Sequence, residues 1–172
     1  EAHLAGGPGV TVVWANVWQK KAALERTLDW AKAERADLIL IGEHPPLDPA
    51  GMLIDDYPYR LDTGIAPDRP FCIRIVAYSR TPIVGGAIHD GPGPNHRPFL
   101  TLAVSVADRT LNIIAAHPVP PHTTSLTQER DRHIALLSAH TREPFVLAGD
   151  FNVTPWSPGF KAIPGRRVGA YL

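Results

Sequence analysis

Five residues whose types bind metals or move protons lie at or just after apolar segments: Asn16, Glu43, His117, Asp150 and Asn152. Sites on layered folds gather at strand ends and in the loops that follow them. Carboxylate and amide oxygens are hard ligands that suit Mg²⁺ or Mn²⁺, which retain waters and bind phosphate oxygens. A histidine beside such a metal can donate to a phosphoryl oxygen or move a proton. These residue types together predict metal-assisted chemistry on a phosphoryl group.

Each of these residues also has a structural interpretation. A carboxylate after a strand, such as Glu43, is more often a cap or turn residue, and an isolated histidine such as His117 is more often structural than catalytic. Asp150 could form an Asx turn within Gly149–Asn152. In an extended segment, by contrast, Asp150 and Asn152 would face the same way, because side chains alternate along a strand. The combination of the five residues, rather than any one of them, favours a functional site.

The apolar patterning predicts the elements that must position these residues. Residues 10–18 are β-branched and aromatic on both faces, which is typical of a buried strand. Residues 19–35 carry apolar residues at helical spacing, and a capping-box spacing at Ser125–Gln128 marks the start of a second helix. The further predicted strands are 37–43, 71–80, 83–89, 99–107, 110–117 and 144–149, with the second helix over 125–140, short helices near 49–55 and 157–162, and mostly loop over 44–70. This order favours an α+β sandwich over a purely parallel sheet.

Composition narrows the class of protein. The chain has 172 residues, 17 Lys and Arg against 17 Asp and Glu, and a single cysteine, Cys72. This length predicts one domain over residues 1–172. Zero net charge argues against a protein that strongly seeks nucleic acid or membrane surfaces, and one cysteine excludes an intramolecular disulfide or a cysteine-based zinc cluster. No run approaches the roughly 18 apolar residues of a transmembrane helix. The tryptophans Trp14, Trp18, Trp30 and Trp156 are expected to pack in the core or an interface rather than to stack on bases.

The motifs around these residues occur in the order of a known family. They are Trp-Ala-Asn-Val around Asn16, Leu-Ile-Leu-Ile-Gly-Glu ending at Glu43, Tyr78-Ser-Arg, Ala-Ala-His-Pro around His117, and Gly-Asp-Phe-Asn-Val-Thr-Pro-Trp-Ser from Gly149 to Ser157. From about residue 10 to residue 160 the chain resembles the endonuclease/exonuclease/phosphatase superfamily, metal-dependent phosphoesterases related to DNase I, and its bacterial branch in particular. The resemblance implies a DNase I-like sandwich of two sheets with helices on the outer faces.

The resemblance also implies a role for each residue. Glu43 would ligate Mg²⁺ or Mn²⁺, and Asn16 would help to hold the metal or a neighbouring carboxylate. Asp150 would orient and activate the attacking water, Asn152 would hydrogen-bond the phosphate or that water, and His117 would contact the phosphoryl group. The implied reaction is hydrolysis of a phosphodiester or phosphomonoester by in-line attack of water.

Two departures from the family pattern qualify this expectation. Gly42 stands where the family usually has Gln, and residues 153–172 contain no Asp, Glu or His, where the family carries an Asp-His pair. We therefore expect the domain to be incomplete at its C-terminus, to lack its last strands and to be inactive as this chain alone. An exposed sheet edge would then favour self-association. The alternative is a non-catalytic binding or interaction module on the same fold.

Substrate and location follow only from the resemblance. The substrate is expected to be a phosphate ester of unknown class, and nucleic acid is allowed but not favoured by the net charge. Bacterial relatives of this branch often carry transmembrane helices ahead of the catalytic domain, and the chain starts at Glu1 rather than Met. The sequence leaves the location unknown, and the extracytoplasmic part of a membrane-anchored bacterial protein is one location that the resemblance implies.

Overall fold

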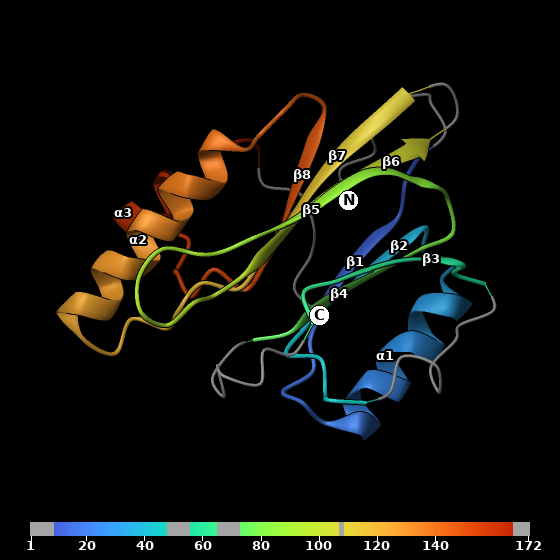
Figure 1. Cartoon of the computed structure of the whole chain (residues 1–172), viewed down its shortest axis with the longest axis horizontal. Coiled ribbons are helices and arrows are strands. Elements are labelled where there is room, and N and C mark those ends of the chain that lie inside the picture. The colour runs from blue at the N-terminus through green and yellow to red at the C-terminus, as the bar shows by residue number, and fades with distance from the viewer. Residues whose placement is uncertain (1–8, 48–55, 65–72, 107–108, 167–172) are drawn as a thin grey trace.

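The chain folds into two mixed four-stranded β-sheets that pack face to face (Figure 1). The computed structural model describes residues 9–47, 56–64, 73–106 and 109–166. Sheet one has the order β1-β2-β4-β3 and sheet two the order β5-β6-β7-β8. The strands are β1 (Val12–Asn16), β2 (Leu38–Gly42), β3 (Tyr59–Asp62), β4 (Ile75–Ser79), β5 (Ile83–His89), β6 (Phe99–Val106), β7 (Arg109–Ala116) and β8 (Phe145–Gly149). The helices are α1 (Lys21–Ala33), α2 (Thr124–Ala139) and α3 (Pro158–Lys161).

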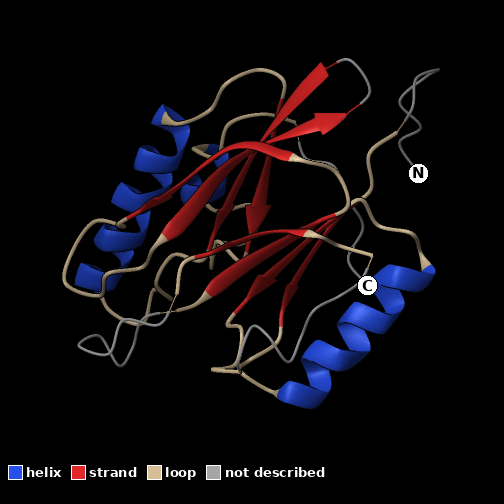
Figure 2. Ribbon diagram, turned by 45° about the vertical axis from the view of Figure 1, so that its right-hand side comes forward, coloured by secondary structure: helices blue, strands red, loops and turns tan. Residues whose placement is uncertain are grey.

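Apolar side chains on both faces of the central strands explain the layers. Between the sheets, β2, β4, β6 and β7 contribute one buried cluster that includes Leu40, Ala77, Leu102 and Ile113. The alternate residues of the same strands face outward, where α1 covers sheet one and α2 covers sheet two (Figure 2). The predicted α+β sandwich with helices on its outer faces is confirmed.

Two parallel pairs of strands set the geometry of the site. β1 runs parallel to β2 through the crossover helix α1, and β7 runs parallel to β8 through α2. All other pairs are antiparallel. Each sheet therefore presents the C-terminal ends of two neighbouring strands at a single edge.

Several sequence predictions differ from the structure in detail. Residues 44–70 were expected to be mostly loop, but Tyr59–Asp62 form β3 by pairing with β4. The second helix begins at Thr124 rather than Ser125, because the Thr123 hydroxyl accepts the Leu126 N–H and caps it. The short helix predicted near residues 157–162 forms as α3, whereas the one predicted near 49–55 lies outside the described residues.

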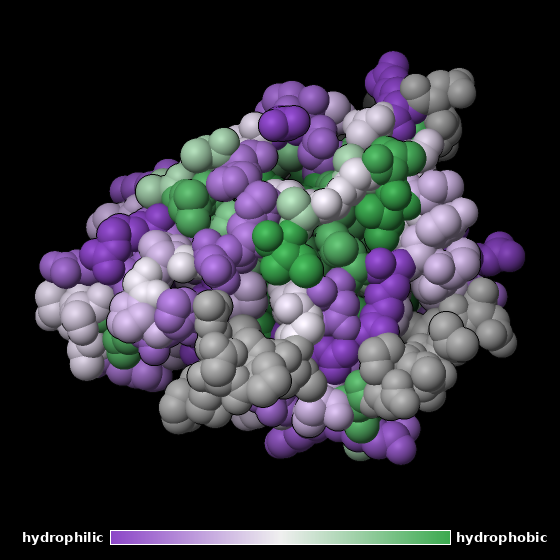
Figure 3. Space-filling model, in the orientation of Figure 1, coloured by the Kyte–Doolittle hydropathy of each residue, from purple (hydrophilic) through white to green (hydrophobic). Residues whose placement is uncertain are grey.

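Several large apolar side chains lie on the surface of the protein. Trp18, Trp30 and Trp156 are exposed, so packing in the core is wrong for these three, whereas packing in an interface stays a prediction. Hydrophobic side chains also gather near the centre of the face in Figure 3. Among the exposed large hydrophobic residues are Val84 and Ile88 on β5 and Tyr59 on β3. Of the helices that the structure describes, none has the length and apolar character needed to cross a membrane.

Candidate active site

Sheet one supplies Asn16 and Glu43. Asn16 ends β1 and pairs with Gly42, which ends β2, so Glu43 is the next residue along the same edge. The Asn16 side-chain N–H donates to Glu43 Oε1 at 2.8 Å, and Asn16 Oδ1 accepts the Trp18 N–H at 3.0 Å. Asn16 thus uses both ends of its amide to fix the Glu43 carboxylate and the turn after β1.

Sheet two supplies His117 and Asp150 in the same way. Ala116 at the end of β7 pairs with Gly149 at the end of β8, so His117 and Asp150 follow side by side. Asp150 Oδ1 accepts the Asn152 N–H at 3.1 Å, which is an Asx turn. Asn152 has φ 51°, so the segment turns and the extended alternative is wrong. The Asn152 side chain donates to the Pro118 carbonyl at 3.0 Å and ties this turn to the segment after β7.

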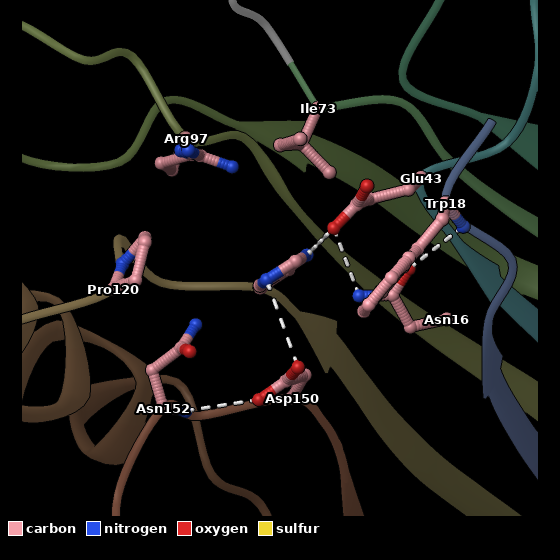
Figure 4. Close-up of a pocket in the computed structure, with 9 residues that line it drawn as sticks. Asn16, Trp18, Glu43, Ile73, Arg97, Pro120, Asp150 and Asn152 are labelled. Carbon is pink, nitrogen blue, oxygen red and sulfur yellow. Dashed lines mark hydrogen bonds and ion pairs between the residues drawn. The ribbon is translucent and has the colours of Figure 1, made fainter.

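Packing of the sheets brings the two pairs together. His117 Nδ1 lies 3.7 Å from Glu43 Oε1, and His117 Nε2 lies 3.9 Å from Asp150 Oδ2. Both separations exceed a hydrogen bond. The surrounding cleft of about 370 Å³ is lined by Asn16, Trp18, Glu43, Ile73, Arg97, His117, Pro120, Asp150 and Asn152 (Figure 4). All five residues singled out from the sequence line this one cleft.

Backbone strain is concentrated at the cleft. Six described non-glycine residues have a positive φ, and three of these line the cleft: Trp18 (51°), Glu43 (52°) and Asn152 (51°). Left-handed conformations of this kind cost on the order of 1–3 kcal/mol each and cluster at functional sites. Asn tolerates this region well, whereas Trp and Glu do not. The strain therefore supports a functional role for the cleft.

Comparison with known proteins identifies the family and the fold. The model of the endonuclease/exonuclease/phosphatase family matches residues 13–170. The chain belongs to this family. The family consists of hydrolases of phosphate esters, and its members generally use divalent metals.

Solved structures share the fold at low sequence identity. An endonuclease/exonuclease/phosphatase protein from Beutenbergia cavernae DSM 12333 has 21% identity and a TM-score of 0.67 over 86% of this chain and 50% of its own. Sphingomyelinase C from Streptomyces griseocarneus has 18% identity and a TM-score of 0.66 over 91% of this chain and 69% of its own. TDP2 from D. rerio, complexed with a single-strand DNA product, has 15% identity and a TM-score of 0.70 over 90% of this chain and 64% of its own. The chain thus spans half the length of the first of these. No curated protein matches it.

Burial controls the protonation of the histidine in this family member. Burial lowers the pKa of His117 below its ordinary 6.5, and Arg97 lowers it further, while Asp150 and Glu43 oppose this shift. The imidazole is therefore mainly neutral at pH 7, with one nitrogen donating and the other accepting. Its buried Nδ1 has no hydrogen-bond partner. Buried polar atoms are usually satisfied, so this nitrogen is available to a bound group.

The donor set fits a hydrated Mg²⁺ or Mn²⁺ better than a closed metal site. Within the described ranges, no group of three or more His, Cys, Asp or Glu side chains could hold a metal ion by itself. Mg²⁺ usually binds through one or two carboxylates and keeps several waters. Glu43 provides such a carboxylate, with 21% of its side chain exposed to the cleft, and the Asn16 hydrogen bond already fixes its orientation. Glu43 is the residue that would hold the metal.

Four cleft residues were not assigned to a site from the sequence: Trp18, Ile73, Arg97 and Pro120. Arg97 enters because Phe99 on β6 pairs with Ala116 on β7, which places the residues before β6 beside those after β7. No local pattern reveals this proximity. Trp18 follows Asn16 by two residues, just beyond the strand end, and that position was the one available clue.

Arg74 anchors the loop that follows Glu43. Its guanidinium donates to both carboxylate oxygens of Asp62, at 3.0 and 2.7 Å, and to the carbonyls of Pro45 and Leu47, at 3.0 and 3.3 Å. Burial alone would raise the pKa of Asp62, but hydrogen bonds from Arg74 and the Gly64 N–H outweigh it and lower that pKa. The network joins β3 and β4 to the chain immediately after Glu43.

We expect Arg74→Met to destabilise the protein by about 2 kcal/mol, because it removes a buried guanidinium that bonds Asp62 and the Leu47 carbonyl, while Arg60 still pairs with Asp62. Chemical denaturation at pH 7 would measure this free energy. Lys21→Met is the control, since Lys21 pairs with Glu25 on the exposed face of α1 and should cost below about 0.5 kcal/mol. Equal losses in the two variants would contradict the assignment.

The stability that the Arg74–Asp62 ion pair contributes depends on pH. The pKa of Asp62 in the folded protein lies below its ordinary value of 3.8. The ionised Asp62 carboxylate therefore contributes its full stability above pH 3.8, and this contribution is lost as the pH falls through the pKa of the folded protein. The stability difference between the unmodified protein and Arg74→Met should therefore narrow below pH 3.8.

Proposed function

We propose that the protein hydrolyses phosphate esters, as a phosphodiesterase or phosphomonoesterase assisted by Mg²⁺ or Mn²⁺. The observation that carries this proposal is the meeting of two strand-end pairs, Asn16 with Glu43 and His117 with Asp150, around one cleft. Membership of the endonuclease/exonuclease/phosphatase family supports the reaction class.

Each side chain has a task that matches its position. Glu43, fixed by Asn16, would hold the metal, which would neutralise charge on the phosphoryl oxygens. Asp150 is 43% exposed, so its carboxylate can reach a water in the cleft, orient it and take its proton. His117 lies between the two carboxylates and, as a neutral imidazole, donates a hydrogen bond to the phosphoryl group.

Asn152 supports this arrangement through the backbone. Its N–H fixes Asp150 Oδ1, which leaves Oδ2 directed towards His117. One proton of its side-chain amide is used by the Pro118 carbonyl, and the residue lines the cleft, where its amide can contact substrate or water. Preorganisation of this kind lowers the cost of reaching the reactive geometry.

Metal removal tests the proposal directly. We expect the full-length protein to hydrolyse bis(p-nitrophenyl) phosphate or p-nitrophenyl phosphate in Mg²⁺, and the two esters separate diesterase from monoesterase activity. Treatment with EDTA should lower the rate at least about 100-fold, because the metal supplies several kcal/mol of charge stabilisation. Excess Mg²⁺ or Mn²⁺ should restore it.

Two results would refute the proposal. Hydrolysis that persists unchanged in EDTA would show that the metal has no part. Binding of phosphate esters with no hydrolysis in any divalent metal would instead identify the non-catalytic binding module.

A further inference from the structure

The large aromatic side chain of Trp18 is exposed to solvent at the rim of the cleft. It is 67% exposed, although it lines the same cleft as Asn16 and Glu43, and Figure 4 shows its indole beside them. An exposed Trp forgoes the burial that normally makes this side chain stabilising. Its place at the cleft, rather than in the core, therefore calls for a role in binding.

The turn that carries Trp18 is rigid and strained. Trp18 and Gln19 are consecutive left-handed residues, with φ of 51° and 53°. The Trp18 N–H donates to Asn16 Oδ1 at 3.0 Å, and the Gln19 N–H donates to the Glu43 carbonyl at 2.8 Å. The turn is thus fastened to the two residues of sheet one that form the site, so the backbone that carries the indole is held next to Glu43.

A cation lies near the ring. Lys20 Nζ lies 5.5 Å from the centroid of the Trp18 ring, within the range of a cation–π contact. This ammonium places a positive charge next to the indole.

We propose that Trp18 is a stacking surface for an aromatic ring in the organic half of the phosphate ester. The inference rests on the proposed function, because it assigns the phosphoryl group to the neighbouring Glu43 and His117. A planar ring next to that phosphoryl group stacks on the indole, and base–aromatic stacking of this kind survives changes in ring identity. The ring is attached either directly to an ester oxygen, as in an aryl ester, or through a sugar, as in a nucleotide.

Binding of small phosphate esters tests this without requiring turnover. Dissociation constants in excess Mg²⁺ would be measured by ligand-observed NMR for phenyl phosphate against ethyl phosphate, and for adenosine 5′-monophosphate against ribose 5-phosphate. We expect the ring to tighten binding about tenfold in at least one pair. The pair that shows the preference identifies whether the ring is bound directly or through a sugar.

Substitutions of Trp18 test whether its indole causes the tighter binding of esters that carry a ring. Trp18→Ala should remove the preference and leave the affinity for the ring-free ester unchanged, whereas Trp18→Phe should retain most of it. Trp156→Ala is the matched control, because Trp156 is 81% exposed and does not line this cleft. Thermal melting would confirm that all three variants fold.

Two results would overturn the inference. One is the absence of any preference for the ring in the unmodified protein, including the absence of binding; the other is a preference that survives in Trp18→Ala. Both are independent of hydrolysis, so the stacking surface can fail while the phosphoesterase activity stands. Conversely, a ring preference without hydrolysis would leave the subsite intact and refute the proposed reaction.

Discussion

The Asp150→Asn protein should hydrolyse bis(p-nitrophenyl) phosphate about 10³-fold more slowly than the unmodified protein, because general-base catalysis contributes roughly 10²–10⁴-fold. Asn keeps an oxygen that can accept the Asn152 N–H, so the Asx turn should survive. The substitution therefore removes the negative charge and the proton acceptor while preserving the local backbone. Steady-state rates in saturating Mg²⁺ would measure the loss.

Two further measurements make the Asp150 result interpretable. The melting temperature of Asp150→Asn should match that of the unmodified protein, since the turn and its contacts are retained. Asp29→Asn on the exposed side of α1 is the matched control and should keep full activity. An Asp150→Asn protein with unreduced turnover would remove Asp150 from the catalytic role.

Glu43→Gln should weaken metal binding by at least about 10–100-fold, since that range is typical even for residues that only support a metal ligand. Gln retains an oxygen to accept the Asn16 side-chain N–H at the position of Oε1, so the carboxamide should keep the orientation of the carboxylate. What is lost is the negative charge that attracts the cation. The apparent dissociation constant for Mn²⁺, measured by electron paramagnetic resonance, reports this directly.

The hydrolytic activity of the Glu43→Gln protein should depend on the fraction of the protein that has a metal ion bound. Hydrolysis should fall at low Mg²⁺ and recover in part as Mg²⁺ is raised, which Asp150→Asn should not do. Glu34→Gln, at the exposed C-terminal cap of α1, is the charge-matched control and should bind Mn²⁺ normally. Unaltered Mn²⁺ affinity in Glu43→Gln would place the metal elsewhere.

The two variants separate the two halves of the site. Glu43 belongs to sheet one and Asp150 to sheet two, and His117 lies 3.7 Å from one and 3.9 Å from the other. Weakened metal binding with Glu43→Gln, together with normal metal binding and slowed turnover with Asp150→Asn, would show that each sheet contributes a different task. The cleft between the sheets is then the place where both tasks meet.

The sequence by itself determined most of the elements and the identity of the main site residues. Strands such as Leu38–Gly42 and Phe145–Gly149 are visible because each is a short run of apolar residues, a local property, although only the first is fully buried. Glu43 and Asp150 stand out because each is a carboxylate directly after such a run. β3 was missed because Tyr59–Asp62 is only four residues long and lies in a segment rich in Pro, Asp and Gly, so it becomes recognisable as a strand only through pairing with β4.

Only the tertiary structure decided how the site is assembled. Parallel pairing of β7 with β8 sets His117 beside Asp150, and the packing of sheet on sheet brings both to Glu43. The positions of Arg97 and Trp18 at the cleft depend on strand register and on a strained turn. Sequence patterning reports which side chains avoid water, whereas the distance between two residues far apart in the chain is set by register and packing, which no local pattern encodes.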